Sequence, residues 1–575
     1  MNTDLVPQTG GAGSARRHDF DALRASAMLL GIALHAGLAF APIPWLAMND
    51  ETSPAIGTFI EVLHGFRLPL FFIMSGFFSA MLLQRRGIAG FLGHRWKRIA
   101  LPLLLGSVTI IPAMWGVIIG GHALQAVHPA PTRERAVPEE TEASIWRAAA
   151  DGDVETVRRL TDSGAAVDSP DPRFVTLPLA WAATGDHADV VEFLLARGAD
   201  PNQRMGDDNT PMHTACFFGA SESARLMLEA GGDLNVPNRH GETPIEAMRH
   251  DAGVVAFVSN LLTVEASFER VQAGRSEIAA MLDADSAQGA ERRTVLDGIM
   301  GVVSGEVFMH LWFLWHLCWL AGGLVLVQLL LRLLPRRSLP DVLVSTPLCL
   351  LGFVPLTALT QSWQANFGPD TSAGLIPASH VLLHYAVFFA AGVMMYRSAR
   401  AADRLGRTWW VYLPIAALAC YLALQILHKP AFLSEFGLPP QVDAWLGPAM
   451  QSVFVWTTSL GLIGVARRVL ARPNAWIRNI SDSSYWLYIV HLPVVVAGQF
   501  ALAYVPFPPA IEFVGLTSAT TLVLLLSYQW FVRYTWIGRL LNGRRVHLKR
   551  SSEAPHSDDR RSSSLTRATR PTAQG

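Results

Sequence analysis

The stretch FDALRASAMLLGIALHAGLAF, residues 20–40, has the length and apolar character of a helix that crosses a lipid bilayer. About 20 such residues are needed to cross roughly 30 Å of hydrocarbon. The stretch departs from that pattern at His35, deep inside it, and at Asp21 and Arg24, where it begins. Ionisable groups at such depth are costly, and they usually face the interior of a helix bundle or a water-filled cavity. The departure therefore marks a candidate site as well as a span.

The three ionisable residues share one face of the predicted helix. Arg24 and His35 are eleven positions apart, which is about three turns of helix. Asp21 lies within roughly 40° of that face, and it is one turn from Arg24, so the two can pair. Because imidazole exchanges a proton near neutral pH, His35 is a candidate general base above an ion pair. A histidine that only hydrogen-bonds to a neighbouring helix is the alternative, and the stripe does not separate the two.

Apolar runs of similar length recur along the chain. The predicted spans, about ten in all, are 20–42, 58–83, 99–119, 308–334, 341–360, 378–397, 408–428, 445–467, 482–504 and 511–533. Basic clusters fall in every second connection between them. By the positive-inside rule, those connections and both termini are predicted to be cytoplasmic. The sequence therefore predicts a multi-pass protein of a bacterial inner membrane.

A polar stretch, 121–305, separates the third and fourth spans, and the same rule predicts that it is periplasmic. Within it, LPLAWAATGDHADVVEFLLARGADPN (177–202) and TPMHTACFFGASESARLMLEAGGDLN (210–235) repeat with a period of about 33 residues, which is typical of ankyrin units. Thr-Pro places proline at the first helical position, and the glycine of RGAD supplies a left-handed helix stop. Two weaker copies extend the predicted repeat domain to about 144–262.

The composition argues against several classes of site. The chain has 46 lysines and arginines against 46 aspartates and glutamates. The polar stretch contains more acids than arginines and no lysine, which argues against binding a nucleic-acid backbone. The four cysteines lack any CxxC or zinc-ligand spacing, so we predict neither a disulfide framework nor a metal site.

Five segments of the predicted spans occur in an order that resembles a known family. They are FDALRASAMLLGIALHA (20–36), FRLPLFFIMSGFF (66–78), RWKRIALP (95–102), HLWFLWHL (310–317) and SDSSYWLYIVHLPVV (481–495). Together they resemble the acyltransferase 3 family of integral membrane O-acyltransferases, and most closely its glucan-biosynthesis protein C-like branch. The resemblance covers roughly 16–120 and 306–540, which is everything but the insert and the tails.

The resemblance implies about ten spans, a cytoplasmic acyl-CoA donor and an acceptor on the far side of the membrane. The family's Arg-x10-His motif maps onto Arg24 and His35, with Asp21 beside them, and we predict that these three residues are catalytic. The family's arginine pair at the third span maps onto Arg95 and Arg98, which we predict to bind the donor. Guanidinium groups bind phosphate bidentately, although a simple topology signal explains such clusters as well. The family lacks an ankyrin insert, so the acceptor stays open.

Four further residues are secondary candidates: Arg67, Glu306, His310 and His491. Arg67, predicted near the outer rim, could orient an acceptor hydroxyl, and interfacial solvation explains it equally well. Glu306 and His310 are one turn apart where the fourth span begins, and catalysis and local pairing are both open. His491 lies inside the ninth span and is the second candidate base.

The predicted fold is therefore all-α, a polytopic membrane helix bundle of about ten spans with an inserted α-helical ankyrin solenoid. The predicted domains are a cytoplasmic N-terminal segment (1–19), spans 1–3 (20–120), the periplasmic insert (121–305), spans 4–10 (306–540) and a disordered cytoplasmic tail (541–575).

The predicted activity is transfer of a succinyl- or acetyl-type acyl group from acyl-CoA to a hydroxyl of a periplasmic or cell-envelope glycan, without a bound cofactor or metal. We expect contacts with membrane lipid and none with nucleic acid, and a protein partner on the ankyrin face stays open. Two alternatives belong to other classes. One is a proton-coupled transporter of an anionic solute, and the other is a membrane-anchored ankyrin sensor or scaffold.

Overall fold

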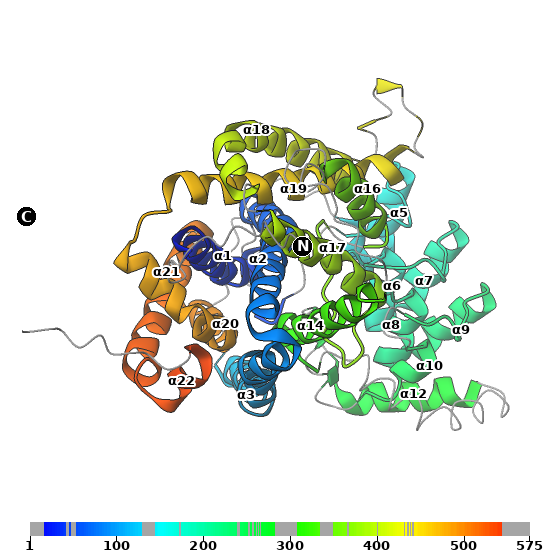
Figure 1. Cartoon of the computed structure of the whole chain (residues 1–575). Helices are drawn as coiled ribbons and strands as arrows, with labels where there is room; N and C mark the ends of the chain where they lie inside the picture. Colours follow the sequence, from blue (N-terminus) through cyan, green and yellow to red (C-terminus); the bar gives the residue numbers. More distant parts are fainter. Residues whose placement is uncertain are drawn as a thin grey trace, which may run out of the picture.

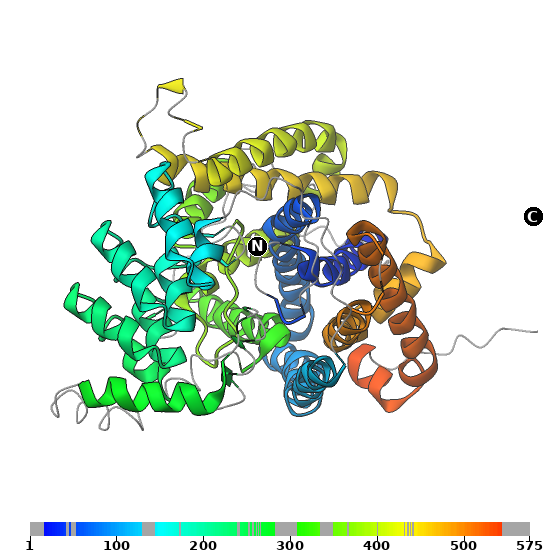
Figure 2. The same ribbon diagram turned by 180° about the vertical axis from the view of Figure 1, so that it is seen from behind.

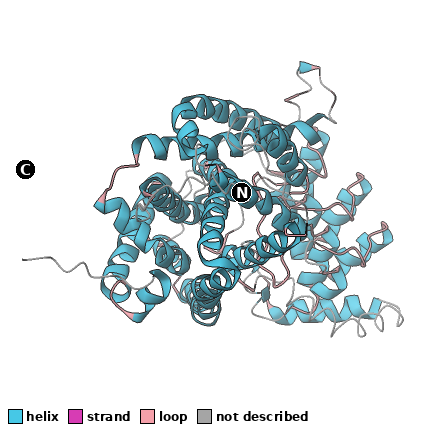
Figure 3. Ribbon diagram, viewed as in Figure 1, coloured by secondary structure: helices cyan, strands magenta, loops and turns pink. Residues whose placement is uncertain are grey.

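The computed structural model describes residues 17–542 apart from 48–52, 129–143, 282–306, 334–348 and gaps of one to three residues. Most of the predicted N-terminal segment and of the predicted tail lies outside the described residues. Every regular element in the described part is a helix, which confirms the predicted all-α fold (Figure 3).

Eight helices in the described part of the chain are long and apolar enough to cross a membrane. One of the eight contains both α2 (Pro54–Arg95) and α3 (Leu101–Val127). The other seven contain α1 (His18–Gly37), α14 (Trp312–Leu331), α17 (Ser379–Arg397), α18 (Ala401–His428), α19 (Asp443–Val469), α20 (Ala475–Leu502) and α21 (Pro509–Ser527). A shorter apolar helix, α16 (Cys349–Gln361), corresponds to the predicted span 341–360.

The second and third predicted spans lie in one continuous helical stretch of 72 residues, from Pro54 to Gln125. The basic connection between them is itself helical, and it contains no proline that would end a helix. The stretch changes direction at Gly87, whose φ of 66° is a left-handed conformation that suits glycine. A π-turn at Trp96–Ala100 follows. Two predicted spans therefore appear as one long, kinked element.

Helices α1 and α2 lie near the centre of the bundle, and the other membrane helices surround them (Figures 1 and 2). Helix α1 packs against α2, α19, α20 and α21. Arg24 contacts Ser481 near the start of both α1 and α20, and the carbonyl of His35 accepts a hydrogen bond from Gln499 near their ends. The two helices are therefore parallel and in register, which places the predicted stripe of α1 against α20.

Two glycines let α2 and α17 approach closely. A Cβ added to Gly76 would overlap the carbonyl oxygen of Phe389, and one added to Gly392 would overlap that of Ile73. Small residues at such crossings allow van der Waals contact between backbones, which is a main source of helix association in membranes.

The insert folds as stacked pairs of short helices. The pairs are α4 (Ile145–Ala150) with α5 (Val154–Asp162), α6 (Pro178–Gly185) with α7 (Ala188–Ala196), and α8 (Pro211–Phe218) with α9 (Ser221–Glu229). Helix α10 (Pro244–Ala247) begins the predicted fourth copy with a capping box between Thr243 and Glu246. Proline is the first residue of α6, α8 and α10, and Gly198 and Gly231 have positive φ, as the repeat pattern predicted.

A further helix, α12 (Phe268–Met281), packs against α8 and α9 at one end of the repeat array. Gly274 touches the backbone of Gly219, and Arg275 donates hydrogen bonds to the carbonyls of Phe217 and His250. Helix α12 is thus an end cap on the array. In both ribbon views the array lies to one side of the membrane helices (Figures 1 and 2).

We predict that Gly392→Ala destabilises the protein, because the new methyl group would push α2 and α17 apart. Overpacking of this kind costs about 1–3 kcal/mol. The thermal unfolding midpoint of the purified protein in detergent measures it. The matched control is Gly323→Ala in α14, where an added Cβ meets no atom within 4 Å. An equal midpoint for both variants would contradict the close crossing.

Candidate active site

The predicted ion pair at the start of α1 is present, and a serine from α20 joins it. Arg24 Nη2 lies 3.2 Å from Asp21 Oδ1 and 2.6 Å from Ser481 Oγ, to which it donates a hydrogen bond. The hydroxyl of Ser481 in turn donates to Asp21 Oδ1 at 3.0 Å. Asp21 is buried, whereas the side chain of Arg24 is 44% exposed. One guanidinium edge is therefore fixed in the protein, and the group stays accessible at the mouth of the bundle.

Three histidines from three helical elements meet deeper in the bundle. The ring of His35 on α1 lies 5.0 Å, centroid to centroid, from the ring of His491 on α20. The ring of His310, in a 3₁₀ turn (Met309–Leu311) that leads into α14, lies 5.5 Å from that of His491. His310 and His491 are buried. The structure thus brings together three of the predicted site residues, which are 456 positions apart at their extremes.

Hydrogen bonds to carbonyls identify the ring nitrogens that carry protons. His310 Nε2 lies 2.9 Å from the carbonyl oxygen of Ile489, and His491 Nδ1 lies 2.8 Å from that of Tyr488. A carbonyl oxygen only accepts, so both nitrogens are donors, and the opposite nitrogen of each neutral ring holds a lone pair. His310 Nδ1, His491 Nε2 and His35 Nδ1 are buried and have no hydrogen-bond partner among the described residues. The cluster therefore offers three imidazoles that can accept a proton.

A proline in α20 explains why a carbonyl is available for His310. Proline lacks a backbone N–H, so Pro493 cannot donate to the carbonyl of Ile489, four residues earlier in the helix. His310 takes that acceptor instead. The predicted pairing of His310 with Glu306 is not tested, because Glu306 lies outside the described residues.

Arg67 occupies a different place from the predicted outer rim. It is only 7% exposed, and a Cβ added to Gly31 of α1 would overlap its Nη1 atom. Gly31 is one turn from His35 on the same helix face. The prediction of an interfacial position followed from two polar residues that precede Arg67 on its helix, Glu61 and His64. The structure instead places the guanidinium beside the histidines.

The two predicted donor-binding arginines hydrogen-bond to different elements. Arg95 Nη2 donates to the hydroxyl of Ser79 at 2.6 Å, inside the bundle. Arg98 Nη1 donates to the carbonyl of Leu540 at 2.8 Å, in the short helix α22 (Trp536–Asn542). Arg98 thus contacts the last described helix, and Arg95 is half-buried at the end of α2. Donor binding by these residues stays a prediction.

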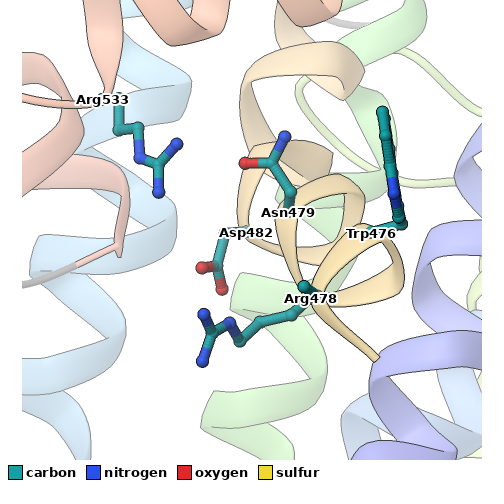
Figure 4. A pocket seen from close by; sticks show the side chains of 6 residues that line it. Trp476, Arg478, Asn479, Asp482 and Arg533 are labelled. Carbon is teal, nitrogen blue, oxygen red and sulfur yellow. The ribbon is translucent and has the colours of Figure 1, made fainter. Parts of the chain in front are cut away.

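A pocket of about 290 Å³ opens beside the start of α20 (Figure 4). It is lined by Ala475, Trp476, Arg478, Asn479, Asp482 and Arg533. The side chains of Arg478 and Asp482 point to the same side of α20, with Arg533 across from them (Figure 4). Ser481 of the rim network lies in the same turn of α20. Sequence reasoning treated this basic segment only as a topology signal, and it did not single out Ser481.

The described residues contain no group of three or more histidine, cysteine, aspartate or glutamate side chains that could hold a metal ion. The polar groups of the site are imidazoles, guanidinium groups, hydroxyls and the carboxylate of Asp21. Such a set can move protons and stabilise negative charge in a place from which hydrocarbon excludes most water.

Comparison with known proteins matches both halves of the membrane bundle to one family. A model of an acyltransferase domain matches residues 17–132 and 280–529, which is more than half of the chain. A model of three ankyrin repeats matches residues 145–238. Four residues that the structure brings together, His35, Arg67, His310 and His491, fall inside the acyltransferase match.

Relatives with curated names show the same likeness over a shorter range. The glucans biosynthesis protein C of Escherichia coli SMS-3-5 is 35% identical over 99 residues, which are 17% of this chain and 25% of that protein. The proteins of the same name from Escherichia coli K12 and Shigella dysenteriae serotype 1 are each 34% identical over 99 residues, with the same coverage. The matched region thus spans about a quarter of the length of these relatives.

We predict that Ser481 and Arg24 are energetically coupled. Ser481→Ala removes the hydroxyl that bridges Arg24 and Asp21, and hydrogen bonds to charged groups contribute about 1.5–3 kcal/mol each, less when a partner is half-exposed. A double-mutant cycle with Arg24→Gln, read from unfolding free energies, should give a coupling of about 1 kcal/mol. Ser481→Thr keeps a hydroxyl and is the control. Additive effects of the two substitutions would contradict the bridge.

Proposed function

The chain belongs to the acyltransferase 3 family of integral membrane proteins, and from this premise we propose that it transfers an acyl group from cytoplasmic acyl-CoA to a hydroxyl of a periplasmic or cell-envelope glycan. The observation that carries the proposal is the cluster of His35, His310 and His491. Its ring nitrogens without a partner among the described residues lie close together inside the membrane bundle. A base at this position can activate a hydroxyl where little water competes with it.

A glycan acceptor is supported by the relatives, which are named for glucan biosynthesis. The acyl group we propose is of the succinyl or acetyl type. The network of Asp21, Arg24 and Ser481 gives acyl-CoA a place to bind. Arg24 is half-exposed, and it lies at the same end of α20 as the pocket that contains Arg478 and Arg533. Guanidinium groups in these positions suit the phosphates of coenzyme A.

The proposed reaction moves one proton out and back. His35 accepts the proton of the acceptor hydroxyl, and the oxygen attacks the thioester carbon. The carbon–oxygen bond forms while the carbonyl electrons move onto oxygen, and the carbon–sulfur bond then breaks as the carbonyl re-forms. His35 returns its proton to the thiolate that leaves, and the products are the ester and free coenzyme A. Gln499, bonded to the His35 carbonyl, and Trp45, stacked 5.9 Å from its ring, hold the base in place.

We further propose that the protein lies in a bacterial inner membrane with both termini in the cytoplasm. The repeat array then lies in the periplasm, on the side from which a glycan acceptor arrives. Ankyrin arrays bind partners along an extended concave surface. We propose that this array recruits the acceptor or a protein that delivers it.

We predict that His35→Gln abolishes acyl transfer in a protein that still folds. Glutamine keeps hydrogen-bonding groups but cannot take and return a proton near neutral pH. Loss of a general base costs about 100- to 10,000-fold in rate. The measurement uses purified protein with labelled acyl-CoA, with and without periplasmic extract as the source of acceptor.

His380→Gln in α17, outside the histidine cluster, is the matched control and should keep wild-type transfer. Substantial transfer by a folded His35→Gln protein would remove His35 from the mechanism. Absence of any acyl transfer by the wild-type protein, with uptake of an anionic solute into proteoliposomes, would replace the proposed enzyme by a transporter.

The topology makes a separate prediction. A reporter that is active only in the periplasm should be active when it is fused near Gly206 in the repeats and silent when it is fused near Ala401. The reason is that basic clusters resist translocation across the membrane. A cytoplasmic reporter at the same two positions is the control and should show the opposite pattern. Activity of the periplasmic reporter at Ala401 alone would overturn the orientation and the acceptor side with it.

A further inference from the structure

We infer that Arg67 is a further catalytic residue of the proposed acyl transfer, and that its guanidinium binds the oxyanion that forms on the acyl carbonyl. The inference rests on the proposed function. It starts from the position of the side chain, which is buried in α2 and lies against Gly31. Because Gly31 is one turn from His35 on α1, the guanidinium lies beside the proposed base.

No carboxylate pairs with this cation in the part of the chain that the structure describes. Arg67 Nε is buried and has no hydrogen-bond partner there, and Tyr385, Tyr488 and the imidazoles of His35 and His491 lie within electrostatic range of its charge. An unpaired charge in a low-dielectric interior costs several kcal/mol. A folded protein tolerates that cost where an anion binds or forms.

A second donor faces the same region. Tyr385 of α17 is fully buried, its hydroxyl has no hydrogen-bond partner among the described residues, and it lies within electrostatic range of Arg67. A guanidinium Nε and a phenol hydroxyl that both lack a partner among the described residues match the requirement of an oxyanion site. In such a site, fixed hydrogen-bond donors face a position where charge develops only during the reaction. Arginine suits the role because it stays protonated when buried.

The packing holds the guanidinium of Arg67 and the phenol of Tyr385 in place without supplying a hydrogen-bond acceptor. Glycine at position 31 leaves room for Nη1 on α1, because any side chain there would overlap the guanidinium. Phe72 of α2 stacks on Tyr385 of α17 with ring centroids 4.3 Å apart, and this contact fixes the phenol. The donors are therefore preorganised by three helices, and they need no rearrangement when charge appears on the carbonyl oxygen.

In the proposed step, attack on the thioester places a negative charge on the former carbonyl oxygen, and Arg67 donates hydrogen bonds to it. The charge returns to the carbon–oxygen double bond when the thiolate leaves, so the guanidinium is unchanged at the end. Removal of one donor to an oxyanion typically lowers kcat by about 100- to 1,000-fold. The effect should fall on kcat and not on donor KM, because the charge exists only in the transition state.

A different anion, a carboxylate at the end of the acyl chain, would also suit a buried guanidinium. The two cases differ in which acyl-CoA substrates react more slowly when Arg67 is removed. An oxyanion forms on every acyl group, whereas a terminal carboxylate is present on succinyl-CoA and absent from acetyl-CoA. We therefore expect equal losses with both donors.

The test compares Arg67→Met with wild-type protein, using labelled acetyl-CoA and labelled succinyl-CoA and a short glucan as acceptor. We expect kcat to fall about 100- to 1,000-fold for whichever donors the wild type uses, with donor KM near the wild-type value. We also expect an unfolding midpoint at or above that of wild type, because methionine replaces an unpaired buried charge. Arg86→Met, at an exposed arginine on the same helix, is the matched control and should change neither quantity.

Gly31→Ala is the second variant, because it keeps the arginine but displaces its guanidinium, and it too should lower kcat. Wild-type kcat in Arg67→Met overturns the inference, and so does a loss of activity that comes with a lower unfolding midpoint in both variants. A rise in KM for succinyl-CoA alone assigns Arg67 to a terminal carboxylate and overturns the oxyanion role. A wild-type protein that acylates nothing overturns the proposed function and the inference together.

Discussion

The site depends on one constraint. A polar atom inside a membrane bundle that lacks a hydrogen-bond partner destabilises the fold by several kcal/mol. Most buried polar side chains in this structure meet it. Ser481 bridges Arg24 and Asp21, and His310 uses a carbonyl that Pro493 leaves free. Against that background, one group of side chains stands out near His35, because each has a buried atom without a hydrogen-bond partner among the described residues: His35, Arg67, His310, Tyr385 and His491. A concentration of unmet hydrogen bonds in one place is typical of a site that binds or transforms a ligand.

The same constraint gives the two ends of the site different chemistry. At the mouth, arginine and aspartate remain partly in water, and their charges suit an anionic donor. Deeper in the bundle, the ionisable groups are mostly imidazoles. A neutral imidazole costs less free energy to bury than a charged group. Arg67 is the exception, since a permanent charge is held beside them. An acyl transfer that begins with an anionic cofactor and passes through an oxyanion uses both environments.

Much of the site was predictable from the local period of the helix. The spacing of Asp21, Arg24 and His35 placed them on one face, and the structure presents that face to α20. The ankyrin pairs were predictable for the same reason, because proline and glycine mark helix ends locally. The depth of Arg67 was not, since it depends on which helix lies against α2, and neither was the partnership of Ser481 with residues 457 and 460 positions away.

The sequence by itself determined the helical class, the positions of the membrane segments and the insertion of a repeat domain between the third and fourth of them. These properties follow from hydrophobic length and from signals within one turn of helix. Only the tertiary structure decided that Arg67 lies beside His35 and which imidazole nitrogens have no partner in the described part of the chain. The reason is physical: hydrogen bonds and burial at the site join α1, α2, α17 and α20, and the pattern of one helix does not specify the side chains on its neighbours.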